Sequence, residues 1–208
     1  MKIIDIEHWN RKEHFEFFSK YDNPYFGIVT EIDCTKAYEK AKKDKVSFFA
    51  YYLHKAIIAV NKVEEFKLRI LNKEVVLYDK IHAGSTLARE DGTFGFSFMK
   101  FSSDFQVFNN ALQQEIEEVK NSSGLRLKGE ALRLDVIHFS SLPWSNFTGL
   151  SHPRNFNTED TVPKITFGKA VKKDNKRVLS ISVEAHHALV DGLHLSQFLA
   201  AFQQEMNR

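Results

Sequence analysis

Two adjacent histidines, followed by an aspartate and a glycine, form the segment of this chain best suited to chemistry. It reads HHALVDG from His186 to Gly192, with the aspartate four residues after the second histidine. Imidazole transfers protons near neutral pH more readily than other side chains. The nearby carboxylate of Asp191 can orient an imidazole, pair with an arginine or cap a helix. The segment is therefore a candidate for general base catalysis.

The residues on either side of this motif predict how its two histidines point. Residues 177–187 alternate between apolar side chains and mostly polar ones, which is typical of a strand. His187 falls in the apolar row and is expected to face the core, whereas His186 points to the opposite face. After Gly192, apolar residues recur at helical spacing as far as Met206. The motif is thus predicted to lie at a turn between a strand and the C-terminal helix.

Other roles for these residues compete with catalysis. An inward-facing histidine is commonly a hydrogen-bonded core residue, and Asp191 can simply be the N-cap of the following helix. Metal binding is disfavoured, because side chains of adjacent strand residues diverge and the nine histidines include neither an HExxH motif nor a Cys/His grouping. The motif alone leaves the structural and the catalytic interpretations open.

The remaining elements alternate between helical and strand patterns. Helices are predicted over residues 36–43, 48–63 and 104–120. Strands are predicted over residues 26–32, 74–78, 92–101, 135–141, 164–171 and 177–187. Asp104 is the expected N-cap of its helix, and Asp33 or Thr35 that of the first helix. Surface loops are expected at residues 120–128 and 151–163. About six strands and four helices favour a layered α/β sandwich, and residues 1–208 are expected to form a single domain.

Composition excludes several classes of protein. The 208 residues are 43% hydrophobic and 27% charged, which indicates a globular chain. A net charge of +2 without a basic stripe disfavours nucleic-acid binding. No signal peptide is expected, because charged residues appear within a few positions of the N-terminus. The most apolar run, Phe48–Val60, is too short to span a bilayer. The single cysteine, Cys34, excludes an internal disulfide and favours a cytoplasmic location. The 19 phenylalanines can fill a core, or line an apolar tunnel or a subunit interface.

Four segments together resemble the chloramphenicol acetyltransferase family. HHALVDG matches the HHxxxDG signature of coenzyme A-dependent acyltransferases, and WNRKEHFEFF, which ends at Phe18, resembles the family opening WxRxEHFEFY. SSLPWSNF, from Ser140, resembles SxxPWxxF, and PKITFGK, from Pro163, resembles PxxTxGK. The matches occur in the family's order and cover essentially the whole chain. The resemblance implies an α/β fold, a two-layer sandwich of a mixed β-sheet and helices.

The resemblance also implies a role for each matching residue. His187 would be the general base, and Ser140 would donate a hydrogen bond to the oxyanion. Asp191 and Arg11 would form a structural ion pair that supports the turn. The residues expected to bind the acceptor are Phe17, Phe18, Tyr25 and Thr166. Those expected to bind coenzyme A are Lys169 and Trp144.

The implied reaction is acetyl transfer from acetyl-CoA, a cosubstrate rather than a permanently bound cofactor, to the 3-hydroxyl of chloramphenicol or to another small alcohol. The family forms homotrimers with active sites between subunits, so His187 is expected to face Phe17, Phe18 and Tyr25 of a neighbouring subunit. No metal, nucleic acid or membrane is an expected partner.

Several positions depart from the family's pattern. Phe18 stands where the family has tyrosine, and the following loop, residues 19–26, contains Asp22, Pro24 and Tyr25 in place of the family's leucine, proline and small residues. These departures keep three alternatives open. One is an acetyltransferase for a different alcohol, and another is a non-catalytic protein that kept the fold. The third, a dihydrolipoyl acyltransferase core, is disfavoured because no lipoyl domain precedes Met1.

Overall fold

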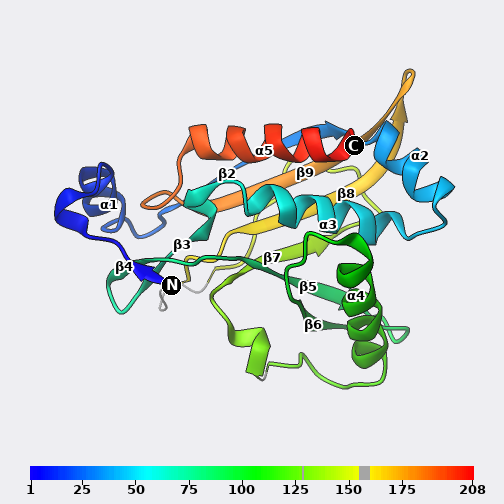
Figure 1. The fold of residues 1–208 in the computed structure, drawn as a ribbon, viewed down its shortest axis with the longest axis horizontal. Coiled ribbons are helices and arrows are strands. Elements are labelled where there is room, and N and C mark those ends of the chain that lie inside the picture. Colours follow the sequence, from blue (N-terminus) through cyan, green and yellow to red (C-terminus); the bar gives the residue numbers. More distant parts are fainter. Residues whose placement is uncertain (128, 155–159) are drawn as a thin grey trace.

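The computed structural model describes residues 1–127, 129–154 and 160–208, and a six-stranded mixed sheet forms its centre (Figure 1). The strand order is β2-β9-β8-β7-β5-β6, in which β7 runs parallel to both β5 and β8 and the other neighbours are antiparallel. In that order the strands are Tyr25–Asp33, Lys176–His186, Lys164–Lys173, Val136–Ser141, His82–Ala88 and Phe94–Met99. A second, three-stranded sheet consists of β1 (Lys2–Ile3), β4 (Glu74–Leu77) and β3 (Leu68–Leu71).

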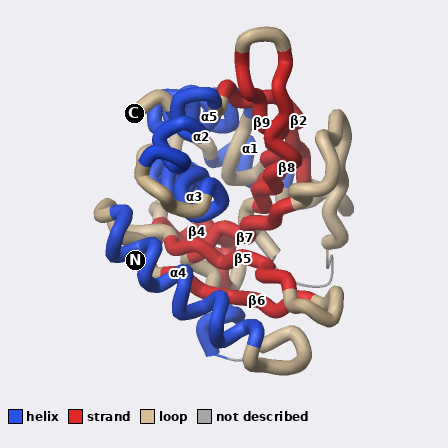
Figure 2. Tube along the Cα trace, turned by 90° about the vertical axis from the view of Figure 1, so that its right-hand side faces the viewer, coloured by secondary structure: helices blue, strands red, loops and turns tan. Residues whose placement is uncertain are grey.

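Helices cover one face of the large sheet. The α-helices are α1 (Lys12–Phe18), α2 (Thr35–Lys43), α3 (Phe48–Val60), α4 (Phe105–Lys120) and α5 (Gly192–Met206). Short 3-10 helices span Ile6–His8, Glu64–Lys67 and Gly129–Leu132. Figure 2 shows α2, α3 and α5 grouped on one side of the strands and a long connecting loop on the other side. The predicted two-layer α/β sandwich is therefore confirmed.

The core lies between the sheet and α3 and α5. Phe167 of β8 is fully buried, with its ring 4.7 Å from that of Tyr52 of α3 and 5.8 Å from that of Phe202 of α5. Ile165, Ile181 and Val183 point to the same face and are equally enclosed. Each such side chain contributes about 1.5–3 kcal/mol through the hydrophobic effect. This packing holds β8 and β9, the strands that carry the two C-terminal motifs, against the helices.

The predicted strands and α-helices are present, and the sequence patterns missed three other strands, one α-helix and the short 3-10 helices. β1, β3, β5 and α1 were not predicted. β5 is missed because its sequence, HAGSTLA, is rich in small residues and lacks the β-branched and aromatic run of a typical strand. It nevertheless lies inside the sheet between β7 and β6, where tertiary pairing outweighs its weak local preference.

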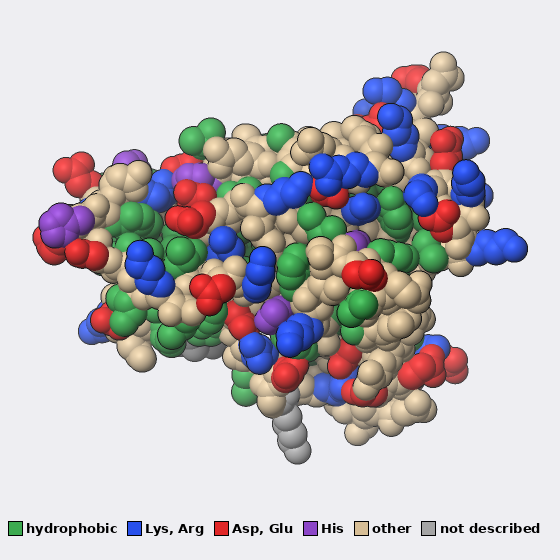
Figure 3. All heavy atoms as spheres, in the orientation of Figure 1, with side chains coloured by type: hydrophobic (Ala, Val, Ile, Leu, Met, Phe, Trp, Pro, Cys, Tyr) green, Lys and Arg blue, Asp and Glu red, His purple; other side chains and the backbone are tan. Residues whose placement is uncertain are grey.

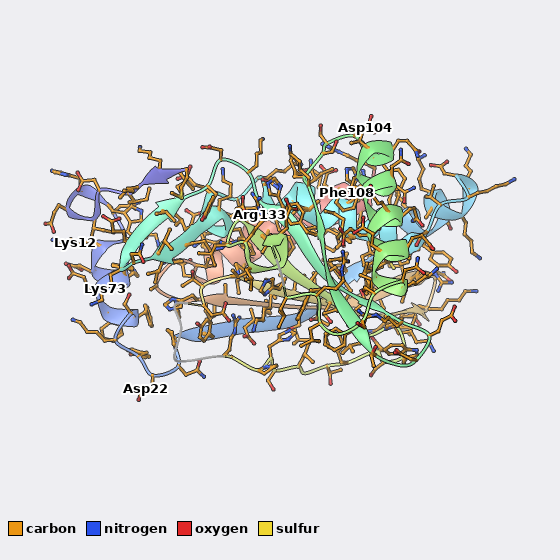
Figure 4. All side chains as sticks on the ribbon, turned by 90° about the horizontal axis from the view of Figure 1, so that it is seen from below. Lys12, Asp22, Lys73, Asp104, Phe108 and Arg133 are labelled. Atoms are coloured by element: carbon orange, nitrogen blue, oxygen red, sulfur yellow. The ribbon has the colours of Figure 1, made fainter. Side chains whose placement is uncertain are left out.

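The helix caps agree with the sequence in one case and differ in another. Asp104 accepts a hydrogen bond from the backbone N–H of Val107 at 3.0 Å, which confirms it as the N-cap of α4; Figure 4 shows it at the end of that helix, one turn from Phe108. The predicted cap of α2 is wrong. Cys34 occupies the N-cap position without a side-chain cap, and Asp33 accepts from the N–H of Thr35 at 3.0 Å. The carboxylate still satisfies a backbone donor near this helix start.

Surface features agree with the modest net charge. On the face drawn in Figure 3, lysine and arginine side chains are interspersed with acidic ones and form no continuous basic surface. Within the described part of the chain, no helix is long and apolar enough to cross a membrane.

Arg69 of β3 is a fully buried cation that joins the two sheets. Its guanidinium donates to the carbonyl oxygens of Leu134 at 2.7 Å and Val136 at 2.5 Å, beside the start of β7, and to those of Phe66 at 2.9 Å and Leu68 at 2.6 Å. Four carbonyls thus depend on one side chain.

Replacing Arg69 with methionine is expected to lower the free energy of unfolding by at least about 3 kcal/mol, because each buried carbonyl left unsatisfied costs about 1–3 kcal/mol. Chemical denaturation measures this change. The control is Arg133→Met, which removes a 39% exposed side chain paired with Asp135 and should cost under about 1 kcal/mol. Equal losses in the two variants would contradict the assignment.

Candidate active site

His187 is the first residue after β9 and lies between two phenylalanine rings. Its backbone N–H donates to the carbonyl of Pro24 at 2.7 Å. Its ring stacks on Phe18, with centroids 3.9 Å apart and planes 6° from parallel, and on Phe26, at 4.2 Å and 25°. The half-buried imidazole is therefore held in one orientation at the turn between β9 and α5, as the sequence pattern predicts.

The two ring nitrogens of His187 differ in their surroundings. Nδ1 is buried and has no hydrogen-bond partner among the residues that the structure describes. A proton transfer from this ring therefore uses Nε2. Among the described residues, the carboxylate of Asp191 is not hydrogen-bonded to either ring nitrogen of His187. Asp191 and His187 therefore do not form the carboxylate–imidazole pair of a catalytic triad.

Asp191 instead holds the N-terminus of α5 against the start of α1. Its Oδ2 accepts from Nη1 of Arg11 at 2.5 Å, and its Oδ1 accepts from the N–H of Leu193 at 3.1 Å. His194 completes a capping box by accepting from the N–H of Asp191 at 3.0 Å. Partial burial alone would raise the pKa of Asp191, but the hydrogen bond from Arg11 and the charge of that guanidinium lower it below its ordinary value. The predicted ion pair is present, and Asp191 is also the N-cap.

His186 occupies the opposite face of the sheet, as strand alternation predicts. It is only 7% exposed, and its Nδ1 accepts from the N–H of Ala188 at 3.2 Å. Its ring meets that of Tyr25 edge-on at 5.2 Å. Burial, assisted by the charge of Arg154, lowers the pKa of His186 to about 4. A neutral His186 stabilises the turn that positions its neighbour.

Ser140 and Thr166 come together through strand register. Ser140 of β7 pairs with Thr166 of β8, which pairs in turn with Ser182 of β9, and directly opposed residues share a face. The Thr166 hydroxyl lies 3.0 Å from Nε2 of His152, and the Ser140 hydroxyl lies 3.4 Å from that of Thr86. A row of hydroxyl groups therefore crosses the sheet on the face away from α3 and α5.

The structure does not bring His187 to these hydroxyls within one chain. Ser140 and Thr86 line a cavity of about 440 Å³ on the loop-covered face, and His187 is not among its lining residues. His187 has the opposite strand parity and lies at the end of the sheet. The predicted general base and the predicted oxyanion donor thus occupy different surfaces of the same chain.

The predicted aromatic residues of the acceptor site are also divided. Phe18 contacts His187 of its own chain, so the expectation that it faces His187 from a neighbouring subunit is wrong. Tyr25 lies on the other face, where its hydroxyl donates to the carbonyl of Asp160 and its ring lies 4.1 Å from the guanidinium carbon of Arg154. Phe17 is 56% exposed.

Residues 19–25 border a cavity of about 390 Å³ beside His186, which also includes Lys73 of the β3–β4 turn. Figure 4 shows Asp22, Lys73 and Lys12 at the same end of the molecule. The loop that departs from the family's pattern therefore lies next to the histidine pair.

The segment that carries Trp144 packs against the middle of β8. The N–H of Leu142 donates to the carbonyl of Phe167 at 2.7 Å, and that of Lys169 donates to Ser145 at 2.8 Å. A side chain at Gly168 would lie 2.9 Å from the Ser145 oxygen, so this close approach requires glycine. Trp144 is 77% exposed and Lys169 is exposed, so both side chains are available to a ligand.

Three residues of the site were missed in the sequence. Phe26 belongs to a predicted strand, but the sequence pattern does not predict its contact with His187. Thr86 lies in the unpredicted strand β5, and His152 lies in a segment without regular structure. No local pattern marks the last two residues, because both reach the site through contacts distant in sequence. Of the predicted loop 151–163, residues 155–159 lie outside the described residues.

The mixed sheet, the strand-to-helix turn that bears HHxxxDG and the Arg11–Asp191 pair are the features expected for the class of acyltransferases that the sequence motifs resemble. A model of the family described as chloramphenicol acetyltransferase matches residues 1–203. The chain therefore belongs to the chloramphenicol acetyltransferase family, whose members use acetyl-CoA as the acetyl donor.

Individual relatives agree with this assignment. A solved structure of a chloramphenicol acetyltransferase superposes with a TM-score of 0.91, at 30% identity and with 99% of each chain covered. Chloramphenicol acetyltransferases of Clostridioides difficile and Bacillus pumilus are 28% and 29% identical, and the alignments cover 97% and 95% of this chain and 93% and 90% of theirs. The dihydrolipoamide acetyltransferase of Azotobacter vinelandii, at 13% identity and a TM-score of 0.67 over 94% of this chain and 86% of its own, shares the fold.

Proposed function

We propose that this protein transfers acetyl from acetyl-CoA to a small alcohol, with the 3-hydroxyl of chloramphenicol as the acceptor. The observation that carries the proposal is the placement of His187, fixed between Phe18 and Phe26 while Asp191 is engaged by Arg11. A rigid imidazole that has no carboxylate partner among the residues described by the structure suits direct proton transfer from an acceptor hydroxyl.

In the proposed reaction, Nε2 of His187 takes the proton of the acceptor hydroxyl as its oxygen attacks the thioester carbonyl. The Ser140 hydroxyl donates to the oxyanion of the tetrahedral intermediate. Collapse of the intermediate breaks the carbon–sulfur bond, and His187 returns the proton to the coenzyme A thiolate. No covalent enzyme intermediate is needed. Cys34 is fully buried, and burial raises the pKa of its thiol to about 12, so it is unsuited to act as a nucleophile.

The separation of His187 from Ser140 supports a site shared between subunits. In a homotrimer, His187 at the edge of one chain would meet the hydroxyl row of the next. We therefore place the active sites at the subunit interfaces, with Thr166 near the tetrahedral intermediate and the exposed Trp144 and Lys169 near coenzyme A. We also place the protein in the cytoplasm.

Removing the Ser140 hydroxyl tests its role in the proposed reaction. Ser140→Ala is expected to lower kcat about 10²–10³-fold, because one fixed oxyanion donor is lost. Ser141→Ala is the matched control, since this neighbour points to the helix face and is bonded to the Tyr52 hydroxyl at 2.9 Å. Coenzyme A release measures both variants. A Ser140 variant as active as the control would exclude the oxyanion role.

A second candidate, acetylation of a different alcohol, is favoured by one observation. The loop of residues 19–25 brings Asp22 and Tyr25 to the cavity beside His186, so this part of the surface departs from the family. A coenzyme A release assay with acetyl-CoA, a thiol reagent and a panel of alcohols that includes chloramphenicol separates the candidates. Release with chloramphenicol far above the panel supports the first. Release only with other alcohols supports the second, and no release with any acceptor excludes both.

A further inference from the structure

We propose that Ser180 of β9 is a positioning residue for the acetyl-CoA site. Through Asn146, its hydroxyl holds residues 142–147, which carry Trp144 and which we call the tryptophan segment, in place beside β8. This role rests on the proposed function, because that function places Trp144 and Lys169 near coenzyme A. Ser180 acts through Asn146, so it affects the affinity for coenzyme A and not the chemical step.

A bulge in β8 presents that strand to the tryptophan segment. The register of β8 against β9 shifts between Phe167 and Ala170. Two residues of β8, Gly168 and Lys169, therefore lie opposite a single residue of β9, Ser180. A bulge of this kind interrupts the ladder and redirects the strand locally. The N–H of Lys169 accordingly donates to a carbonyl of the tryptophan segment at 2.8 Å.

The Ser180 side chain links β9 to the same segment. Its hydroxyl donates to Oδ1 of Asn146 at 2.7 Å, and Ser180 is only 1% exposed. The bond passes directly beside Gly168, where a Cβ atom would overlap the Ser180 oxygen and lie 3.1 Å from the ring of Phe147. Glycine therefore leaves the space through which the hydroxyl reaches Asn146.

The position of Trp144 depends on these anchors. Its side chain is 77% exposed, so packing against the rest of the chain restrains it little. Backbone hydrogen bonds join the segment to β8, and the Ser180 side chain joins it to β9. Loss of the hydroxyl frees the part of the segment that follows Trp144 and leaves the sheet intact. A loop that is already held in its binding conformation loses less entropy when the ligand binds, which raises the affinity.

Ser180→Ala is suited to test this role because it should change the stability of the fold little. A methyl group replaces a buried hydroxyl, and the amide of Asn146 is exposed, so water satisfies that amide once the bond is lost.

Calorimetric titration with coenzyme A measures the effect. Ser180→Ala is expected to weaken binding about 3- to 10-fold, as one hydrogen bond is lost. Asn146→Leu should weaken binding equally. The double variant should lose no more than either single variant, because both changes remove the same bond. Ser122→Ala is the matched control: this half-buried hydroxyl donates to the carbonyl of Val119 at 2.9 Å in the turn after α4, and its loss should leave binding unchanged.

Two further readouts distinguish positioning from a general loss of structure. In steady-state kinetics, Ser180→Ala should raise the KM for acetyl-CoA and leave kcat and the KM for the acceptor unchanged. In a Trp9→Phe background, Trp144 is the only tryptophan of the chain, so fluorescence anisotropy reports its motion alone. The anisotropy should fall when Ser180→Ala is added, with an unchanged thermal midpoint.

An affinity for coenzyme A that is unchanged in Ser180→Ala would overturn this role, and so would additive losses in the double variant. A rise in both KM values together with a lower thermal midpoint would mean that Ser180 only supports the fold. Weaker binding of coenzyme A in the variant, without acetyl transfer to any alcohol by the unaltered protein, would contradict the proposed reaction and leave the positioning role supported. Acetyl transfer with an unchanged affinity in the variant would contradict the positioning role alone, and no binding of coenzyme A to the unaltered protein would contradict both.

Discussion

His187→Ala is expected to lower kcat for acetyl transfer by about 10²–10⁴-fold while the protein stays folded, because it removes the general base. The effect should be this large because the base is pre-positioned: Phe18 and Phe26 hold its ring, and Pro24 holds its backbone. Alanine keeps the backbone hydrogen bond, so the turn should survive. Coenzyme A release measures the change in turnover.

The matched control for this variant is His14→Ala, which removes an exposed histidine from α1, the helix that also carries Phe18. It should leave kcat unchanged. Thermal unfolding and gel filtration show whether each variant keeps its fold and assembly. Substantial residual activity in a folded His187→Ala protein would refute the general-base assignment.

Asp191→Asn is expected to have the second largest effect, through structure rather than proton transfer. Arg11 is 8% exposed, and two of its guanidinium nitrogens have no hydrogen-bond partner among the described residues, so Asp191 is its main counter-charge. Leaving a buried charge unpaired costs about 3–5 kcal/mol. Because Asn is as good an N-cap as Asp, the helix cap is kept and the variant isolates the ion pair.

The double variant Arg11→Met/Asp191→Asn tests this explanation. Replacing both members of a buried pair is often nearly neutral, so it should recover much of the free energy of unfolding lost in the single variant. Activity is expected to fall in Asp191→Asn because the turn that bears His187 loses its support. An unchanged thermal midpoint together with an unchanged kcat would contradict the role assigned to this pair.

The same ion pair predicts a pH dependence of stability. The folded state lowers the pKa of Asp191 below its ordinary value of 3.8, so the unfolded chain binds this proton more readily. The stabilisation is therefore complete above pH 3.8 and is lost as the pH falls through the lower folded value. Denaturation of the unaltered protein and Asp191→Asn should show a difference that shrinks in this acidic range.

How far the site was predictable differs from residue to residue. The position of His187 at a strand-to-helix turn follows from short-range alternation and helical spacing, both of which are properties of neighbouring residues. The Arg11–Asp191 contact was implied by the family resemblance and not by any local pattern. Thr86 and His152 were missed because Thr86 lies in a strand of small residues and His152 lies in a loop. Neither segment has a local sequence pattern that predicts contact with the hydroxyl groups of Ser140 and Thr166.

The sequence by itself determined the order of the elements with strong local patterns, the parity that separates His186 from His187, and the family. These properties depend on residues close together in the sequence and on the order of the motifs along the chain. Only the tertiary structure decided that Phe18 and Phe26 enclose His187. It also decided that Asp191 both pairs with Arg11 and caps the N-terminus of α5. Finally, it placed Ser140 and Thr166 on the face of the sheet away from His187. These contacts join segments that are far apart in the sequence. They depend on the register between paired strands and on the packing of loops, because local composition does not determine which distant segments meet.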